Sequence, residues 1–137
     1  MQLGMLLFFG LLAMPDMAAA FQEKRTITVR ANKTEVVYRF ALLNARFARE
    51  MDKCQAARPP TIVVTRKPEF GSVKVKKGVR FDATDNPGCK DGKVLGSIVE
   101  FTSSKRGSTS FKIDVLYRQG GYYDHKFGDV TFNIRVR

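Results

Sequence analysis

The chain has 137 residues, of which 44% are hydrophobic and 27% are charged, and its formal net charge is +11 at pH 7. This length and composition predict one globular domain with its own core and exclude an intrinsically disordered chain. The chain has two cysteines, one histidine and no C-x-x-C spacing, which disfavours a structural zinc site with its four ligands, so we expect no metal and no cofactor.

The first 20 residues have the pattern of a secretory signal peptide. Leu3 to Met14 is an almost unbroken apolar run, and Ala18-Ala19-Ala20 supplies an A-x-A cleavage site. The run is shorter than the roughly 20 residues that span a bilayer, and no second run follows, so we expect no transmembrane segment. Because the segment before the run has no Lys or Arg, a buried N-terminal helix is the alternative. We expect a periplasmic or secreted protein, cleaved after Ala20, with one domain at 21–137.

The basic charge predicts attraction to anionic partners. Removing residues 1–20, which contain one acidic and no basic side chain, raises the formal charge from +11 to +12. Such a charge favours contact with lipopolysaccharide, acidic polysaccharide, nucleic acid or acidic proteins. The basic residues are scattered along the chain, so a charge that only keeps the protein soluble is the alternative.

After residue 20 the dominant sequence period is two. Segments 26–30 and 72–76 alternate apolar and polar residues, segment 35–40 is rich in β-branched and aromatic residues, and every residue of 61–65 is β-branched. Alternation of this kind predicts strands with one buried and one solvated face, as in antiparallel sheets.

The clearest strands lie in the C-terminal half, at 98–102, 110–117 and 130–136. Turn signals separate the strands, among them Lys67-Pro68-Glu69-Phe70-Gly71. About seven such strands predict an all-β antiparallel sandwich. We expect its core to contain Ile27, Val29, Val63, Val73, Val75, Val99, Phe101, Phe111, Ile113, Val115, Phe132, Ile134 and Val136.

Residues 41–52 form the one ambiguous segment. Phe40, Leu43, Phe47 and Met51 follow one another at spacings of three, four and four, which is typical of a helix. We expect about three helical turns here, or a strand end followed by one short helix.

Cys54 and Cys89 predict a disulfide, because an even pair of cysteines in an exported protein is usually joined. The bond would close a loop of roughly 35 residues and contribute about 3–4 kcal/mol on the chain-entropy estimate.

An ordered set of features spans about the last 80 residues. Cys54 is followed by Pro59-Pro60-Thr61-Ile62-Val63-Val64, by Lys67-Pro68-Glu69-Phe70-Gly71-Ser72-Val73, and by strand-like segments at 110–115 and 130–136. This set resembles bacterial Ig-like and cadherin-like domains, in which a P-x-x-G-x-V turn joins the two strands of a hairpin. The resemblance implies an Ig-like sandwich that serves as an adhesive, spacer or binding module of the bacterial envelope and has no catalytic residues.

A catalytic set is not evident in the sequence. His125 is the only histidine and has Asp124 and Asp129 nearby, so a small hydrolase using His125 is one alternative. No G-x-S-x-G motif accompanies it, and a lone loop histidine is usually a solvated surface residue. We therefore expect no catalytic residue.

Two groups of residues are candidates for binding. The first is the loop before the last strand, where Tyr122 and Tyr123 offer contact area and polar side chains nearby offer charge and hydrogen bonds. The alternative is that these tyrosines pack back onto the sandwich. The polar side chains are those of Arg118, His125 and Lys126.

The second group is a ribbon of basic residues, of which Lys74 and Lys76 alternate with valines and so share the outward face of one strand. Such a face suits phosphate or sulfate groups, while the lack of interleaved aromatic residues argues against specific nucleic-acid recognition. Exposed lysines that prevent edge-to-edge aggregation are the alternative. The ribbon consists of Arg66, Lys67, Lys74, Lys76, Lys77 and Arg80.

These patterns predict a non-enzymatic, exported, Ig-like module of the bacterial cell envelope that acts through protein–protein or surface contacts. The first alternative is a cationic protein that binds anionic polymers such as lipopolysaccharide, acidic polysaccharide or nucleic acid. The second alternative is the hydrolase.

Overall fold

The computed structural model describes residues 21–41, 59–82, 93–117 and 125–137. These residues form strands and the short connections between them, which confirms the prediction of an all-β chain. The strands are β1 (Phe21–Val29), β2 (Glu35–Phe40), β3 (Thr61–Arg66), β4 (Ser72–Asp82), β5 (Lys93–Thr102), β6 (Gly107–Tyr117) and β7 (His125–Val136). The predicted helix at 41–52 lies outside the described residues except for Ala41. None of the described segments forms a helix long and apolar enough to cross a membrane.

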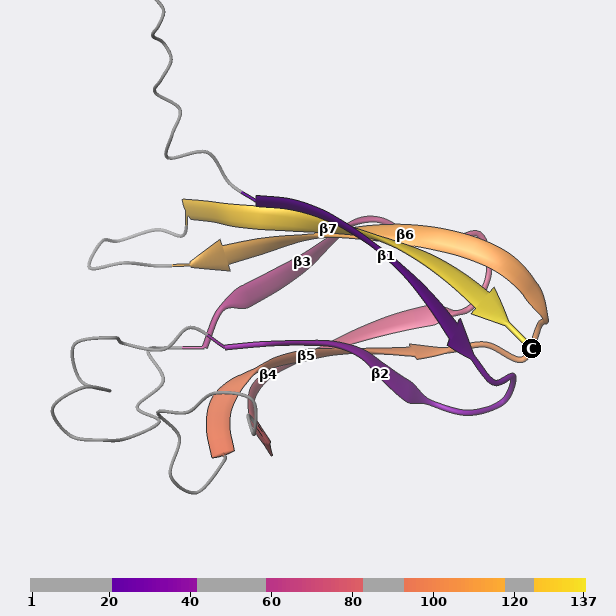
Figure 1. The fold of residues 1–137 in the computed structure, drawn as a ribbon, viewed down its shortest axis with the longest axis horizontal. Helices are drawn as coiled ribbons and strands as arrows, with labels where there is room; N and C mark the ends of the chain where they lie inside the picture. Colours follow the sequence, from indigo (N-terminus) through magenta and orange to yellow (C-terminus); the bar gives the residue numbers. More distant parts are fainter. Residues whose placement is uncertain (1–20, 42–58, 83–92, 118–124) are drawn as a thin grey trace, which may run out of the picture.

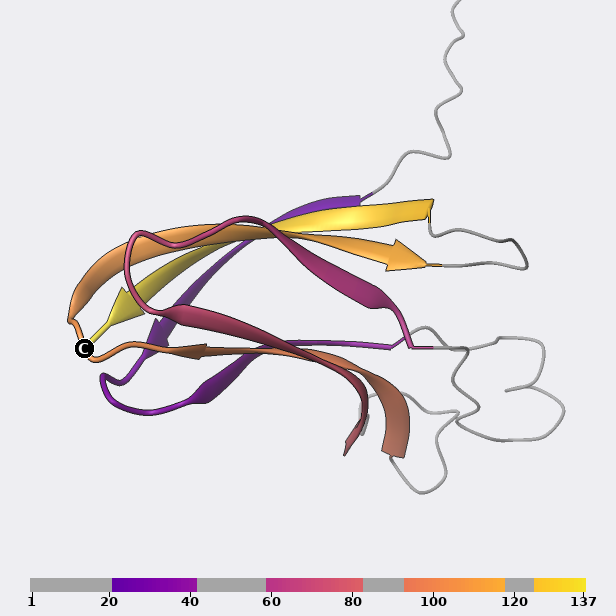
Figure 2. The same ribbon diagram turned by 180° about the vertical axis from the view of Figure 1, so that it is seen from behind.

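The strands form two sheets that lie one over the other (Figures 1 and 2). One sheet has four strands in the order β1-β7-β6-β3, and the other has three in the order β2-β5-β4. Neighbouring strands are antiparallel, as expected, with one exception: β1 runs parallel to β7, from Phe21 beside Gly128 to Val29 beside Val136. The prediction of a wholly antiparallel sandwich was therefore wrong for this pair.

The connection after β1 explains the parallel pair. The chain does not turn back beside β1 but crosses to the other sheet, where β2 begins. Asn32 in this connection has φ of 64°, a left-handed conformation that Asn adopts more readily than most residues. β2 is therefore not the neighbour of β1, which lies instead beside β7, the last strand of the chain.

The turn at 67–71 also crosses between the sheets. β3 and β4 belong to different sheets, so the hairpin that the Ig-like resemblance implied is not formed. Gly71 has φ of 86°, and a Cβ there would lie 2.5 Å from Cζ of Phe101. Glycine at this position therefore permits both the backbone conformation and the close approach of the turn to the core.

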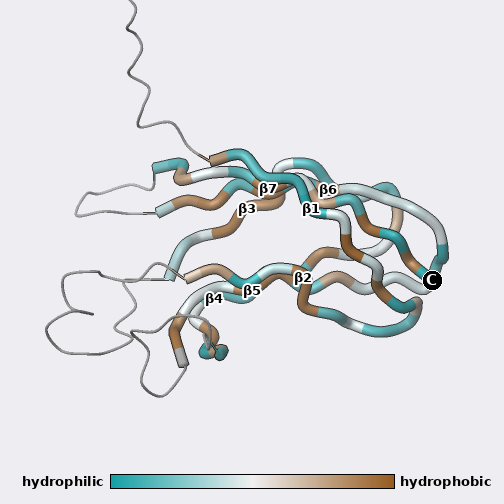
Figure 3. The backbone as a smooth tube through the Cα atoms, in the orientation of Figure 1, coloured by the Kyte–Doolittle hydropathy of each residue, from teal (hydrophilic) through white to brown (hydrophobic). Residues whose placement is uncertain are grey.

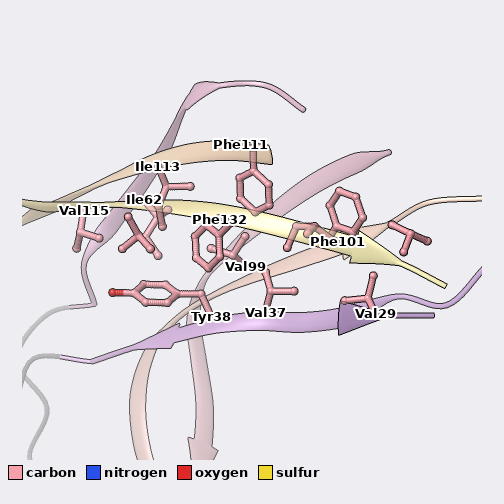
Figure 4. Close-up of a cluster of buried hydrophobic side chains, with 13 residues drawn as sticks. Val29, Val37, Tyr38, Ile62, Val99, Phe101, Phe111, Ile113, Val115 and Phe132 are labelled. Atoms are coloured by element: carbon pink, nitrogen blue, oxygen red, sulfur yellow. The ribbon is translucent and has the colours of Figure 1, made fainter. Parts of the chain in front are cut away.

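The core lies between the two sheets and centres on three fully buried phenylalanines (Figure 4). The rings of Phe111 and Phe132 stack with centroids 4.7 Å apart, and those of Phe101 and Phe111 stack at 6.0 Å. Along β6 and β7, buried residues alternate with more exposed ones, and the hydropathy of the chain varies along the strands (Figure 3). The period-two pattern of these strands is thus the pattern of their burial.

The prediction of the core was wrong for one residue, Val63. Val63 is 42% exposed, whereas its neighbour Ile62 is 6% exposed and lies in the core. Ile62 is paired with the buried Val115 on β6, which turns Val63 to the outer face. The uniformly β-branched run 61–65 contains no alternation from which this register can be read.

The sequence pattern also missed two core residues on β2. Val37 and Tyr38 are consecutive, and both are buried in the core. A bulge makes this possible, because Val36 pairs with Glu100 and Tyr38 with Val99, so that Val37 is an additional residue on β2. A strict period of two does not place two neighbours on one face.

Candidate binding surfaces

Several predicted site residues lie outside the described part of the chain. Cys54 and Cys89, the predicted disulfide partners, are among them, as are Arg118, Tyr122 and Tyr123 from the predicted loop before the last strand. The disulfide and the tyrosine surface therefore stay predictions.

His125 and Lys126 begin β7, and both are exposed. Lys126 Nζ lies 2.9 Å from Asp129 Oδ2 and 3.7 Å from Asp114 Oδ1. The hydrogen bond to Asp129 raises the pKa of Lys126, with smaller contributions from the charge of Asp114. Asp129, one of the two acids considered as a partner of His125, is thus paired with Lys126.

The six residues of the predicted basic ribbon are all exposed but do not lie on one surface. Lys74 and Lys76 occupy the outer face of the three-stranded sheet, beside Glu100 and Ile98 of β5. Lys76 Nζ lies 3.3 Å from Glu100 Oε2, so part of the charge on this face is balanced within the protein.

A bulge at Gly78 separates Arg80 from these lysines. Lys77 pairs with Ser97 and Val79 with Gly96, so Gly78, with φ of 78°, is an additional residue in β4. The inserted residue reverses the alternation, which places Arg80 on the opposite face of the strand from Lys76.

Lys77 instead connects the edges of the two sheets. Its Nζ donates a hydrogen bond to Thr61 Oγ1 on β3 at 2.9 Å. The basic ribbon predicted from the sequence is therefore not one continuous surface at Lys77.

Arg66 and Lys67 lie on the outer face of the four-stranded sheet. A bulge in β3 places Arg66 opposite Lys112 of β6, whose neighbours in sequence, Phe111 and Ile113, are buried in the core. The guanidinium Nη2 of Arg66 donates a hydrogen bond to Ser110 Oγ at 3.0 Å. These two basic residues thus face away from Lys74 and Lys76, across the thickness of the sandwich.

Arg66 and Lys67 border a shallow cavity of about 610 Å³ on this outer face, which we call the polar basin. Three small polar side chains form its centre: Asn133 of β7 is paired with Ser110 of β6 on one side and with Thr26 of β1 on the other. Long side chains surround them, so the basin is hollow where the central side chains are short. The basin is lined by Thr26, Arg66, Lys67, Glu69, Ser108, Thr109, Ser110, Asn133, Ile134 and Arg135.

Positive charge predominates around the polar basin. Arg66, Lys67 and Arg135 line it together with one carboxylate, that of Glu69. Within the described residues, neither Lys67 nor Arg135 forms an ion pair.

Positive side chains also lie beside the polar basin, in the neighbouring row of paired residues on the same outer face. Lys24 of β1 and Lys112 of β6 are both paired with Thr131 of β7, and Arg66 lies beyond Lys112. Neither lysine has an ion pair in the described part of the chain. The outer face of the four-stranded sheet therefore presents cations over a wider area than the basin alone.

Sequence reasoning identified Arg66 and Lys67 but missed the rest of the polar basin. Its central residues come from three strands that are distant in sequence, and only the pairing register places them in one row. The available signal was that Thr26, Ser110 and Asn133 occupy outward positions of predicted strands. That signal does not show which strands are neighbours.

The described residues contain no group of three or more His, Cys, Asp or Glu side chains that could hold a metal ion. No protein-family model matches the chain, and no curated protein matches it. A solved structure, the solution structure of amebosin, is similar at a TM-score of 0.38 and 17% identity, over 87% of this chain and 100% of that chain. A similarity this weak carries no argument about function.

Proposed function

We propose that the chain is a non-enzymatic binding module with an Ig-like fold, exported to the bacterial cell envelope. The observation that carries this proposal is the polar basin, an exposed hollow on the outer face of a sheet, with hydrogen-bonding groups at its centre and cations around it. A surface of this kind can hold a ligand or partner without any catalytic group.

The order of the strands supports the Ig-like part of the proposal. In Ig constant-type domains the third, sixth and seventh strands form one sheet, and the second, fifth and fourth strands lie together in the other. Here β3, β6 and β7 share a sheet in the same way, as do β2, β5 and β4. The first strand differs, because it lies beside the last strand and not beside the second.

The packing of Phe21 is compatible with export and cleavage. Phe21 is the first residue that the structure describes, and it would become the N-terminus after cleavage behind Ala20. The Phe21 ring packs against those of Phe127 and Phe40, with centroids 5.5 and 6.0 Å away. Cleavage at the expected place would therefore keep these ring contacts in the mature protein.

Expression of the full chain in a bacterium, followed by intact-mass analysis of the periplasmic fraction, tests this part. We expect a mature protein that begins at Phe21 and has the mass of a chain with Cys54 and Cys89 joined. A protein that stays in the cytoplasm with residues 1–20 attached would contradict export, and two free thiols in periplasmic material would contradict the disulfide.

A second candidate function is binding of anionic polymers, favoured by the cations around the polar basin, two of which, Lys67 and Arg135, have no ion pair among the described residues. We expect the mature protein to bind dextran sulfate with an affinity that falls steeply as salt rises, because charge attraction between exposed groups is screened. Titration calorimetry at several salt concentrations measures this. Affinity that is absent at low salt, or that is independent of salt, would contradict this function.

A further inference from the structure

We propose that the polar basin is a binding site for a carboxylated polysaccharide, in which sugar hydroxyls contact the centre and uronate carboxylates contact the arginines. This inference rests on the proposed binding of anionic polymers and gives that function a site and a ligand class. The residues that define the site come from β1, β6, β7 and the end of β3.

The centre of the basin matches the hydroxyl groups of a sugar. Thr26, Asn133 and Ser110 lie in one row across three neighbouring strands, which spans about 10 Å at ordinary strand spacing. Hydroxyl and amide side chains both donate and accept hydrogen bonds, as sugar hydroxyls do. The short side chains also leave the space that a sugar ring needs.

The arginines around the centre match carboxylates. A guanidinium presents donors in a planar fork that binds both oxygens of a carboxylate. Arg66 uses Nη2 for its bond to Ser110, which fixes the side chain over the basin and leaves further donors on the guanidinium. Arg135 lies two residues beyond Asn133 on β7, opposite Ser108, so the two arginines come from different strands around the same hollow.

The composition of the basin favours a uronate polymer over the other polyanions considered. Among the described residues, no aromatic side chain lines it, so these residues offer no platform on which the bases of a nucleic acid could stack. Glu69 disfavours a densely sulfated chain more than one with a single carboxylate on each sugar, and its carboxylate can accept a hydrogen bond from a sugar hydroxyl. A polymer with one carboxylate on each sugar and free hydroxyls suits both kinds of group.

The cations beyond the basin indicate a polymer and not a single sugar. Lys24 and Lys112 flank the basin on the same outer face and have no ion pairs in the described part of the chain. A chain that leaves the basin along this face would bring further carboxylates close to them.

The experiment measures binding of polygalacturonate to the mature protein by titration calorimetry, with two double variants of equal charge. Arg66→Gln with Arg135→Gln removes two cations from the basin. Lys74→Gln with Lys76→Gln removes two cations from the outer face of the other sheet and is the matched control. We expect the arginine pair to lower affinity about tenfold or more, as for loss of charge-assisted hydrogen bonds, and the lysine pair to lower it less than threefold.

A third variant tests the centre of the basin without changing charge. Asn133→Leu removes the central amide and fills the hollow, and Asn133 is an exposed residue, so the fold should be kept. We expect this variant to lower affinity for polygalacturonate about fivefold or more while its affinity for dextran sulfate stays within twofold, since loss of one hydrogen bond costs about 1 kcal/mol. Thermal unfolding of each variant shows whether the fold is intact.

The outcomes separate this inference from the function on which it rests. Equal losses in the two double variants, or no effect of Asn133→Leu, would overturn the basin as the site while leaving polyanion binding in place. Binding of dextran sulfate without binding of polygalacturonate would overturn the carboxylated ligand alone. If neither polymer bound at low salt, the polyanion-binding function itself would be wrong.

Discussion

The guanidinium of Arg66 donates a hydrogen bond to Ser110 Oγ at 3.0 Å and so joins the end of β3 to the middle of the four-stranded sheet's outer face. The sequence separates these two residues by 44 positions, and a bulge in β3 brings them together. One long cationic side chain is thereby held over a row of short polar ones. This relationship gives the polar basin its shape and its charge.

Ser110→Ala should weaken binding of polygalacturonate about two- to fivefold while lowering thermal stability only slightly. The substitution removes the acceptor that orients Arg66, and an exposed hydrogen bond of this kind contributes about 1 kcal/mol or less. Calorimetric titration and thermal unfolding of the variant measure the two quantities. If Arg66→Gln lowered affinity but Ser110→Ala did not, Ser110 would have no role in orienting the guanidinium.

Ile62→Ala and Val63→Ala should differ sharply in their effect on stability. Ile62 is 6% exposed within the core, so its truncation should cost about 2–4 kcal/mol, while Val63 is 42% exposed and its truncation should cost about 0.5 kcal/mol or less. Urea denaturation of both variants measures the free energy of unfolding. A larger loss at Val63 would mean that β3 is paired one residue out of the register described here.

The burial pattern of the strands shows which core residues could be predicted from the sequence and which could not. Strict alternation in the middle of β6 and in the second half of β7 identified most of the core, because one face of each strand is buried there. The failure at Val63 comes from a run without alternation, and two further failures come from bulges: Val37 is an additional residue on β2, and Gly78 is one on β4. A bulge reverses the alternation without a change in composition, so the predicted ribbon grouped Arg80 with Lys74 and Lys76 although it lies on the opposite face of the strand from Lys76.

The polar basin could not be predicted for a different reason. Each of its central residues was visible as a polar position on a predicted strand, but β1 is the neighbour of β7, at the other end of the chain. Long-range pairing of this kind depends on how the two sheets pack. Local sequence carries little information about it.

Gly71→Ala and Gly78→Ala should separate backbone strain from steric overlap. Both glycines have positive φ, 86° and 78°, but a Cβ at Gly71 would lie 2.5 Å from Cζ of Phe101, whereas one at Gly78 would meet nothing within 4 Å. We expect Gly78→Ala to cost about 1–2 kcal/mol from strain alone. Gly71→Ala should cost about 1–3 kcal/mol more, because overlap with a fully buried ring forces the core to rearrange.

Chemical denaturation of the two glycine variants measures these costs. Equal losses would mean that the turn at 67–71 can move away from Phe101 without a penalty. That result would contradict the close packing of this turn against the core.

Stability should fall in alkaline solution as Tyr38 ionises. Burial, and to a lesser degree the carboxylate of Glu23, raise the pKa of Tyr38 from 10.0 to about 12, while the charge of Arg25 opposes the shift. The neutral phenol is therefore favoured by the folded state. Its contribution to stability is fully present below pH 10 and is lost as the pH rises through the window from 10 to about 12.

Thermal unfolding of the wild type and of Tyr38→Phe between pH 9 and pH 12 tests this dependence, since the variant cannot ionise at this position. We expect the unfolding temperature of the variant to fall less over the window than that of the wild type. Ultraviolet titration of the folded protein should show one tyrosine that ionises near pH 12 in the wild type and not in the variant. Identical pH profiles would contradict a buried phenol at residue 38.

The location of the ligand is the most direct test of the account. Backbone amide chemical shifts of isotopically labelled mature protein, recorded as polygalacturonate is added, report which residues are affected. We expect the largest changes at Thr26, at Ser108 to Ser110 and at Asn133 to Arg135, all of which line the polar basin. Changes that centred instead on β4, or on residues 118–124, would show that the polymer binds elsewhere and would contradict the basin as the functional site.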